Sequence, residues 1–381
     1  MPIKRLTLKK ILSFNESTVE LGPLNVLIGP NAVGKSNLIE AISLLQAAPT
    51  GIEGQILRGG GVRQWLWLGE REPAAPTEVE CELTLPRRPE LGPLSYRLDF
   101  WGGPPGFEIL HERLMDGASD DPNSHAYFMR SGKGVQFGAE GMAMSPKESV
   151  FARFKSPGDP TPITEVGEYF EQIKIFREFR TGPASQARSG ISTSVPKDFL
   201  WEGADNLALV LHELDFLGAH DRVREYLKRF CERFEDVKVR VGEGLARTFL
   251  KESGLSDMLS GVRMSDGTLK FLCLLAVLLH PRPAPLVCIE EPELGLHPDA
   301  LRLVAEVLVE ASEHMQLIVT AHSEALVDAL TDRPESVLVC ERDFDNGTQF
   351  KRLAQDELDE WLEHYTLGEL WRKGEIGGGR W

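Results

Sequence analysis

The sequence predicts an α/β fold that combines a mixed and parallel sheet with an antiparallel β lobe and a helical lobe. Between residues 78 and 137, short strand-like runs separated by Pro, Gly and Asp clusters predict antiparallel strands. Helical patterns dominate residues 206–235. From residue 269 onward, helices alternate with short apolar strands, and this alternation predicts a parallel sheet.

Apolar periodicity predicts most elements of the N-terminal half as strands. These strands cover residues 3–8, 17–21, 24–28, 79–85, 95–101, 107–114 and 126–137. Residues 138–162, rich in Gly, Ser and Pro, are expected to form a long loop. A short helix from Glu168 leads to a strand at 173–179, and the Ser- and Gly-rich residues 180–196 are expected to be mobile.

The C-terminal half contains a hairpin, formed by residues 237–241 and 246–250, followed by the alternating elements. In order, these are a helix at 269–279, a strand at 286–289, a helix at 299–310, a strand at 316–320, a helix at 324–330 and a strand at 336–340. We place a lobe boundary after residue 180. Lobe 1–180 then holds the antiparallel β subdomain, and lobe 181–381 holds the helical region.

Composition and charge restrict the partners and the compartment. The 381 residues are 42% hydrophobic, as in a globular protein, and the formal net charge is −16. A field of this sign repels nucleic acid and anionic membrane, so any DNA contact must come from a local basic patch or a partner. The five cysteines include no C-x-x-C pair. With no signal peptide or bilayer-length apolar run expected, this cysteine usage predicts a cytoplasmic protein.

The segment after the strand at 24–28 has the pattern G-x-x-x-x-G-K-S. Glycines allow such a loop to wrap its N–H groups around phosphates at a helix start, although an isolated match is often only a Gly-rich turn. Here an apolar helix follows the loop. Lys35 would reach the β- and γ-phosphates, and the Ser36 hydroxyl would bind Mg²⁺. The predicted nucleotide-binding residues are Gly29, Pro30, Asn31, Ala32, Val33, Gly34, Lys35, Ser36 and Asn37.

Two adjacent carboxylates end the apolar strand at 286–289. Glu290 can hold Mg²⁺ through water, and Glu291 can accept a proton from the water that attacks the γ-phosphate. Apolar strands often end in an acidic turn, so the pair indicates chemistry only because the phosphate loop is also present.

Two further polar turns occur farther along the chain. Ser265 and Gly267 precede the helix at 269–279; Ser265 is a good N-cap, and alternatively the pair starts a second phosphate-binding helix. His322 follows the strand at 316–320. A lone histidine is more often structural, but this one is expected at the sheet edge that carries the phosphate loop, where it could bond the γ-phosphate.

With these motifs in this order, the chain resembles the ABC-type ATPase heads of the RecF, SMC and OLD-like branch, which are P-loop NTPases. Residues 29–36 match Walker A, 265–268 the signature, 286–291 Walker B, 293–298 the D-loop and His322 the switch histidine. Within this branch, the chain looks like the bacterial stand-alone predicted AAA-type ATPases, several of which act in phage defence. The tail residues 367–371 and 377–379 share this resemblance.

The chain departs from the family pattern at Walker B and at the signature. Glu290 stands where Asp is usual, and the signature lacks the second Gly and the Gln of the transporter sequence. The Q-loop has two candidates, Gln64 and Gln172, and either could be a surface glutamine.

The resemblance implies a Mg²⁺-dependent ATPase in which two copies sandwich two ATP molecules. Each site would combine Lys35, Ser36, Glu290, Glu291 and His322 of one head with Ser265 and Gly267 of the other. Hydrolysis would release the pair and act on DNA or on an effector such as a separately encoded nuclease, in phage defence or DNA repair. DNA binding by the chain alone is expected to be weak, and no membrane partner is expected.

Three other functions compete with this one. A transporter subunit would need a membrane partner and a transporter-like signature, and an SMC-type maintenance protein would carry long coiled coils between the halves of its head. A TOPRIM nuclease would hold metal with Glu341, Asp343 and Asp345. In that class the acids lie on separate strands, whereas Asn346-Gly347 favours a hairpin turn here.

Basic residues offer few surfaces for DNA. Arg177 and Arg180 end a strand near the expected nucleotide edge and could contact phosphate or a partner, although ordinary ion pairs are the simpler expectation. Together with Arg188 they form the candidate basic surface. The helix at 221–235 mixes both signs of charge and is expected to be a solvated face with i,i+4 pairs.

Overall fold

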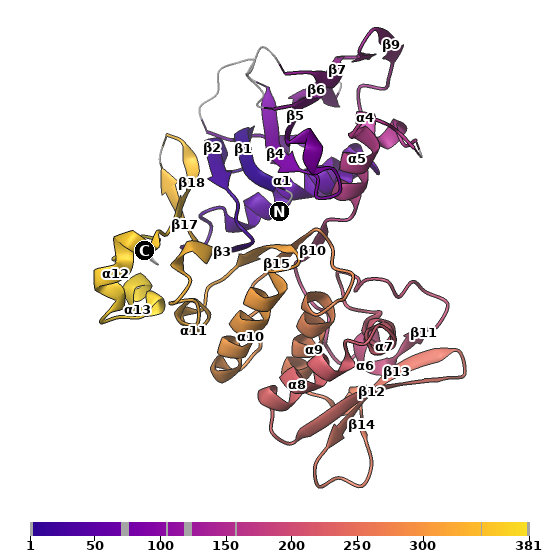
Figure 1. The fold of residues 1–381 in the computed structure, drawn as a ribbon, viewed down its shortest axis with the longest axis vertical. Helices are drawn as coiled ribbons and strands as arrows, with labels where there is room; N and C mark the ends of the chain where they lie inside the picture. Colours follow the sequence, from indigo (N-terminus) through magenta and orange to yellow (C-terminus); the bar gives the residue numbers. More distant parts are fainter. Residues whose placement is uncertain are drawn as a thin grey trace.

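A 14-stranded sheet runs through the molecule (Figure 1). The structure is a computed structural model that describes residues 3–69, 76–103, 106–117, 124–156, 158–343 and 345–378. The first five strands in spatial order pair in parallel, and the other nine pair antiparallel; we call these parts the parallel half and the antiparallel half. The fold is therefore the mixed α/β fold that the sequence predicts.

The parallel half contains, in spatial order, β10 (Lys174–Phe176), β15 (Leu286–Glu290), β16 (Gln316–Thr320), β3 (Leu24–Ile28) and β17 (Val337–Asp343). Both β3 and β16 are buried along their whole length. Thr320 is the register partner of Glu290 on one side and of Leu27 on the other. Because the strands are parallel, the loops that follow them meet at one edge of the sheet.

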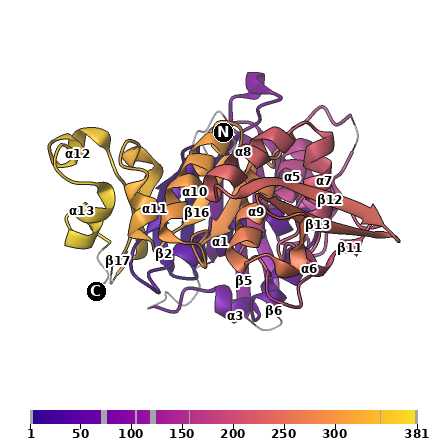
Figure 2. The same ribbon diagram turned by 90° about the horizontal axis from the view of Figure 1, so that it is seen from below.

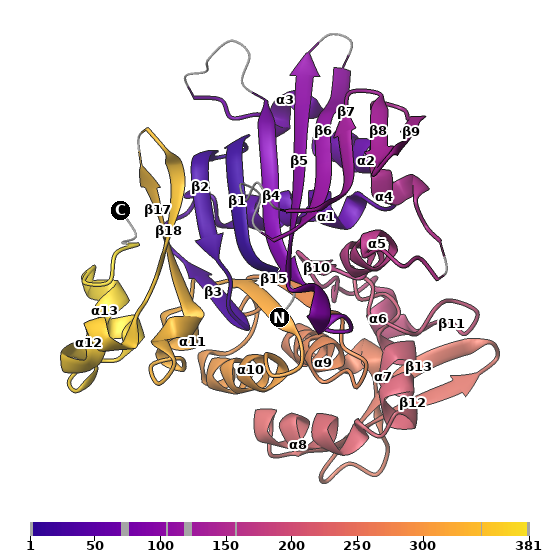
Figure 3. The same cartoon turned by 45° about the horizontal axis from the view of Figure 1, so that its top comes forward.

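The antiparallel half continues from β17 toward the far edge of the sheet. Its strands, in spatial order, are β18 (Gly347–Arg352), β2 (Phe14–Glu20), β1 (Ile3–Ile11), β4 (Thr77–Thr84), β5 (Pro93–Gly103), β6 (Gly106–Asp116), β7 (Ala126–Ser131), β8 (Gly134–Phe137) and β9 (Glu140–Ala143). Figure 3 shows the strands of this half side by side, with β18 next to β2 and, with β17, on the left of the view. The predicted antiparallel strands are confirmed, and so is the hairpin turn that contains Asp345 and Asn346.

Two N-terminal predictions are wrong in part. Residues 126–137 form two strands, because Gly132 turns the chain with a φ of +55°. The predicted loop at 138–162 contains β9 and the short helix α4 (Val150–Arg153). All residues of β9 are exposed, so this edge strand has no apolar alternation that would reveal it.

Helices cover both faces of the parallel half. One face packs against α1 (Lys35–Ala47), whose neighbours include α2 (Ile52–Arg58) and α5 (Ile163–Glu171). The short helix α3 (Val62–Trp65) packs against α2 and β5. The other face packs against α9 (Asp266–Leu278) and α10 (Pro298–Ala311). Side chains alternate along β3 between two core clusters. Leu27 belongs to the cluster that contains α1, and Val26 and Ile28 belong to the cluster that contains α9 and α10.

A helical lobe with a small second sheet lies beside α9 (Figure 2). Its elements are α6 (Gln186–Ser189), β11 (Ile191–Ser192), α7 (Leu207–Phe216), α8 (His220–Phe230), β12 (Phe234–Gly242), β13 (Leu245–Glu252), β14 (Leu259–Ser260) and the 3-10 turn η2 (Gly261–Arg263). The predicted hairpin is confirmed as β12 and β13.

The ion pairs of α8 differ from the predicted i,i+4 pattern. Arg222 pairs with Glu225 at i,i+3 and also with Glu310, and Arg229 pairs with Glu306. Glu306 and Glu310 belong to α10, so these arginines link the helical lobe to a helix that packs on the parallel half of the sheet.

The C-terminal elements are α11 (Glu324–Asp328), α12 (Gln355–Leu362) and α13 (Leu367–Lys373), and the remaining 3-10 turns are η1 (Pro89–Leu91) and η3 (Pro334–Ser336). Strands from both sides of residue 180 interleave in the large sheet, and the lobe boundary there stays a prediction. Across the described residues, the structure contains no helix of the length and apolarity that a bilayer crossing requires.

Candidate nucleotide-binding site

The loop between β3 and α1 is a tight wrap with unusual backbone angles. Gly29, Ala32 and Gly34 have φ values of +146°, +61° and +113°. Nζ of Lys35 donates to the carbonyl oxygens of Gly29 at 2.8 Å and Pro30 at 2.9 Å. Burial lowers the pKa of Lys35 because the ammonium loses hydration. The lysine therefore lies over the loop that it is predicted to serve.

Glycine is required in this loop by two close approaches as well as by φ. A Cβ atom placed on Gly29 would lie 2.4 Å from the carbonyl oxygen of Cys340 in β17. One placed on Gly34 would lie 2.2 Å from Oγ1 of Thr348 and 2.4 Å from Oγ of Ser13. Strands distant in sequence thus form the outer wall of the loop.

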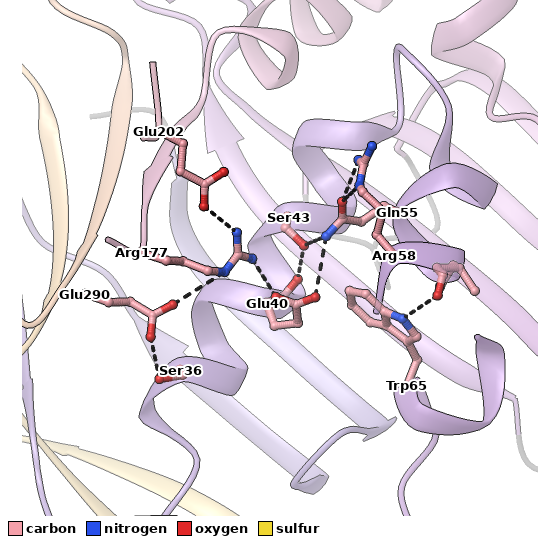
Figure 4. Close-up of polar contacts among 10 residues, drawn as sticks. Ser36, Glu40, Ser43, Gln55, Arg58, Trp65, Arg177, Glu202 and Glu290 are labelled. Carbon is pink, nitrogen blue, oxygen red and sulfur yellow. Dashed lines mark hydrogen bonds and ion pairs between the residues drawn. The ribbon is translucent and has the colours of Figure 1, made fainter. Parts of the chain in front are cut away.

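The two predicted metal ligands are side by side (Figure 4). Oγ of Ser36, in the first turn of α1, donates to Oε2 of Glu290 at 2.7 Å. Burial raises the pKa of Glu290, while the hydrogen bond from Ser36 opposes that shift. Hydroxyl and carboxylate oxygens are the ligands that Mg²⁺ prefers, so the pair fits this ion.

Glu291 and His322 also lie together. Nε2 of His322 is 3.4 Å from Oε1 of Glu291. Glu291 has a φ of +46°, which is uncommon outside glycine, and its N–H donates to the carbonyl oxygen of Thr320 at 3.0 Å. The strand end thereby holds the second acid in a strained turn that directs it toward the histidine.

Glu293 is a site residue that sequence reasoning placed only in the D-loop. Its side chain is buried, and Oε1 accepts from the backbone N–H of His322. Burial raises the pKa of this carboxyl group. Glu293 therefore fixes the loop that presents the histidine, a role that the segment's acidic composition alone did not indicate.

Ser265 and Gly267 lie at the start of α9. Oγ of Ser265 accepts from the N–H of Thr268 at 3.1 Å, which makes Ser265 the N-cap. A Cβ atom on Gly267 would lie 3.2 Å from the carbonyl oxygen of Gly295. Within the described part of the chain, no hydrogen bond or ion pair joins Ser265 or Gly267 to residues 29–36.

Arg188 supports the start of α9 from inside the protein, so its predicted place on a basic surface is wrong. Its residue is only 8% exposed. The guanidinium donates to the carbonyl oxygen of Thr181 at 2.6 Å, to that of Met264 and to the carboxylate of Asp266. No local pattern in the Ser- and Gly-rich segment around Arg188 could have indicated these partners.

Arg177 follows the carboxyl end of β10 and lies next to Glu290, the carboxylate predicted to hold Mg²⁺. It pairs with Glu40 at 2.6 Å, with Glu202 at 3.2 Å and with Glu290 at 3.6 Å. Arg180 pairs with Asp205 at 2.6 Å. The expected ion pairs of both arginines are confirmed.

The two Q-loop candidates lie elsewhere. Gln172 comes before β10, at the opposite end of the strand from Arg177, and Gln64 belongs to α3. At the sheet edge near Glu290, the residue that follows β10 is therefore an arginine. The strand predicted at 173–179 is shorter in the structure. As the edge strand of the sheet, β10 pairs only with β15, and this pairing covers three residues.

A cleft of about 850 Å³ adjoins this arginine. Residues of α1, α2, β10 and the segment 196–202 line it. A chain of polar contacts leads from Glu290 into the cleft. It passes through Arg177, Glu40 and Gln55 to Arg58 (Figure 4).

Comparison with known proteins gives one family match and several distant relatives. A family model described as "AAA domain, putative AbiEii toxin, Type IV TA system" matches residues 24–83 and 144–328. The Old nuclease of Escherichia phage P2 is 23% identical over 394 residues, which cover 93% of this chain and 61% of that protein. The chain thus spans about three-fifths of the Old nuclease. The DNA replication and repair protein RecF of Magnetococcus marinus is 50% identical over 46 residues, 12% of each chain.

Solved structures of SMC heads share the fold. An Smc head bound to the C-terminal winged-helix domain of ScpA has a TM-score of 0.61 at 14% identity, covering 93% of this chain and 99% of that one. The Pyrococcus furiosus Smc head bound to the C-terminal domain of ScpA has a TM-score of 0.59 at 15% identity, covering 95% and 99%. By its matched family model the chain belongs to the AAA domain family described above, and its fold is that of an ATPase head of the RecF, SMC and OLD type.

Proposed function

We propose that this protein binds ATP at residues 29–36 and hydrolyses it with Mg²⁺. The observation that carries the proposal is a convergence at one sheet edge. There the Lys35 ammonium, the Ser36–Glu290 pair and the Glu291–His322 pair follow neighbouring parallel strands. A phosphate cradle, oxygen ligands for a metal and a carboxylate base are the parts that phosphoryl transfer to water requires.

Each group has a separate role in the proposed reaction. The loop N–H groups and Lys35 would hold the β- and γ-phosphates, and Lys35 would leave the carbonyls of Gly29 and Pro30 to do so. Ser36 and Glu290 would hold Mg²⁺, which supplies positive charge beside the phosphates. Glu291 would orient the attacking water and accept its proton. His322 would bond the γ-phosphate through Nε2, while Glu293 keeps its loop in place.

The catalytic unit is proposed to be a dimer. Ser265 and Gly267 lie at a capped helix start, and among the described residues no hydrogen bond or ion pair joins them to residues 29–36 of their own chain. A helix start of this kind attracts anions, so these residues would close over ATP held by a second copy. Each copy would then complete the site of the other.

The biological role is proposed from the relatives. The Old nuclease and the DNA replication and repair protein RecF are named for processes on nucleic acids. We extend that context to this chain: ATP-driven closure and release would act on DNA or on an effector such as a separately encoded nuclease, in phage defence or DNA repair.

Lys35→Ala tests the hydrolysis proposal. The purified chain should release phosphate from ATP in the presence of Mg²⁺ and lose that activity when EDTA is added. Lys35→Ala should bind ATP weakly in calorimetry, because it lacks the cation on the β- and γ-phosphates. Lys351→Ala, which removes an exposed ammonium on β18, is the matched control and should behave as wild type. Retained ATP affinity in Lys35→Ala would contradict the cradle.

A further inference from the structure

The C-terminal tail turns back onto the nucleotide loop. After α13, Gly374 ends the helix in the left-handed conformation, and the chain returns toward β17. Nε1 of Trp371 donates to the carbonyl oxygen of Gly378 at 2.8 Å. The N–H of Gly378 donates to Oε1 of Glu341 at 2.9 Å. Two hydrogen bonds thus hold Gly378, one at its N–H and one at its carbonyl oxygen. Gly379, part of the same sequence motif, lies outside the described residues.

Gly378 lies directly against the first glycine of the nucleotide loop. A Cβ atom placed on Gly378 would be 3.4 Å from Cα of Gly29 and 2.9 Å from Cγ1 of Val339. Gly377 and Gly378 have φ values of +80° and +61°, so a side chain at either position would be strained in addition. The glycine pair allows the backbone to pack tightly against Glu341 and Val339, which places Gly378 beside Gly29.

The other end of the same segment holds the helix after the switch histidine. The N–H of Gly368 donates to Oδ1 of Asp328 at 2.8 Å, and Oγ1 of Thr366 donates to the same oxygen. A Cβ atom on Gly368 would lie 2.7 Å from the carbonyl oxygen of Glu324, the first residue of α11. Figure 1 shows α13 (yellow) beside α11 and β17. Because α11 follows His322 after one residue, α13 supports the histidine loop.

We propose that residues 366–378 are a brace that positions the nucleotide loop relative to the switch-histidine loop. The inference rests on the proposed function in that it takes residues 29–36 as the nucleotide site. A glycine-rich loop that is free to move loses conformational entropy when it closes on phosphates. By fixing Gly29 before the ligand arrives, the brace lowers that entropic cost and raises affinity for ATP.

Trp371→Phe and Gly378→Ala test the brace in the full-length chain. Trp371→Phe keeps an aromatic ring but removes the N–H that holds Gly378. Gly378→Ala drives a methyl group into Val339 at a φ that favours glycine. Both variants should bind a non-hydrolysable ATP analogue about three- to tenfold more weakly, the range expected when one or two supporting contacts are lost. In steady-state hydrolysis measured over a range of ATP concentrations, the factor by which kcat falls should be smaller than the factor by which KM rises.

Two control variants separate the brace from general destabilisation. Gly254→Ala, on the loop after β13 and outside the brace, has a comparable backbone penalty, since its φ is +82°, but a Cβ atom there meets no atom within 4 Å. It should bind the analogue as wild type does. Glu341→Gln keeps an oxygen acceptor for the N–H of Gly378 and should bind more tightly than Glu341→Ala. Melting temperature is recorded for every variant to establish that each one is folded.

The outcomes distinguish this inference from the proposed function. The brace is refuted if folded Trp371→Phe and Gly378→Ala bind the analogue as wild type, or if Gly254→Ala weakens binding as much as they do. Lys35→Ala is measured in the same assay. If Lys35→Ala also binds normally, the nucleotide site itself is misplaced; if only the brace variants bind normally, the site stands and the brace does not.

Discussion

Glu291 combines an uncommon backbone conformation with a charged partner. A glutamate with a φ of +46° persists only where its surroundings hold it, and such residues cluster at functional sites. Here the hydrogen bonds of its N–H to Thr320 fix the turn, and the carboxylate lies 3.4 Å from His322. The local strain thus coincides with the position proposed for the catalytic base.

Glu291→Gln should keep ATP binding and remove most turnover. The amide fills the same space but cannot accept a proton, so we expect kcat to fall by about 10²-fold or more. Phosphate release and analogue binding measured on the same sample check this outcome. Glu313→Gln, at an exposed carboxylate just after α10, is the matched control. A Glu291→Gln variant with near-normal kcat would remove Glu291 from the role of base.

Arg177 and Mg²⁺ are proposed to compete for Glu290. The guanidinium lies 3.6 Å from Oε1 of Glu290, but its side chain is 36% exposed, so solvent screens the interaction. Arg177→Gln should therefore lower the Mg²⁺ concentration for half-maximal hydrolysis by only about two- to tenfold. Arg180→Gln, whose arginine pairs with Asp205 instead, should leave it unchanged. An unchanged or higher Mg²⁺ requirement in Arg177→Gln would contradict the competition.

At the scale of elements, α9 is a helix whose start is fixed by distant residues. Ser265 caps it, while Arg188 binds the carbonyl oxygen of Met264 and the carboxylate of Asp266 on either side of the cap. Its apolar body is buried against the parallel sheet. A rigid helix with an exposed polar start can present that start to a partner without reordering.

Ser265→Arg should abolish turnover and leave ATP binding intact. The long cation would occupy the place proposed for the γ-phosphate of a second copy, whereas each Walker A loop remains unchanged. Light scattering with ATP should show the loss of the dimer, and phosphate release should fall with it. Ser194→Arg, on the loop after β11, adds the same side chain elsewhere. If turnover of Ser265→Arg in a dilute, monomeric sample equals that of wild type, the shared site is excluded.

At the scale of the whole molecule, the net charge of −16 opposes contact with nucleic acid. The candidate basic surface is smaller than the sequence predicts, because Arg188 is buried and Arg177 and Arg180 are paired with carboxylates. We therefore predict that a DNA-binding face at these arginines needs a partner or a second head to complete it.

Duplex DNA should bind the isolated chain weakly and with strong salt dependence. Fluorescence anisotropy at physiological salt should give a dissociation constant no tighter than about 1 μM, the usual range for non-specific binding. Affinity should fall steeply as salt rises, because released counterions supply most of the driving force. Nanomolar binding without nucleotide or partner would show that a local patch outweighs the global charge, and it would favour a protein that handles DNA directly.

The sequence by itself determined the class of fold and the order of its motifs. Short apolar runs predict the parallel strands β3, β15 and β16, because a strand buried on both faces is largely apolar. The edge strand β9 was missed because all its residues are exposed, and β10 was predicted too long because only three of its residues pair with β15. Local motifs also predict the two helix starts: the phosphate-loop pattern places Ser36 in the first turn of α1, and the N-cap preference places Ser265 just before α9.

Only the tertiary structure decided which distant residues meet at the site. Gly34 faces Thr348, Arg188 reaches Met264, and Gly378 covers Gly29, each across scores or hundreds of positions in sequence. Local patterns reflect interactions within a few residues, whereas these contacts depend on strand order and on how the helices cover the sheet. For that reason the loop that holds the nucleotide could be predicted from the sequence, while the residues that support it could not.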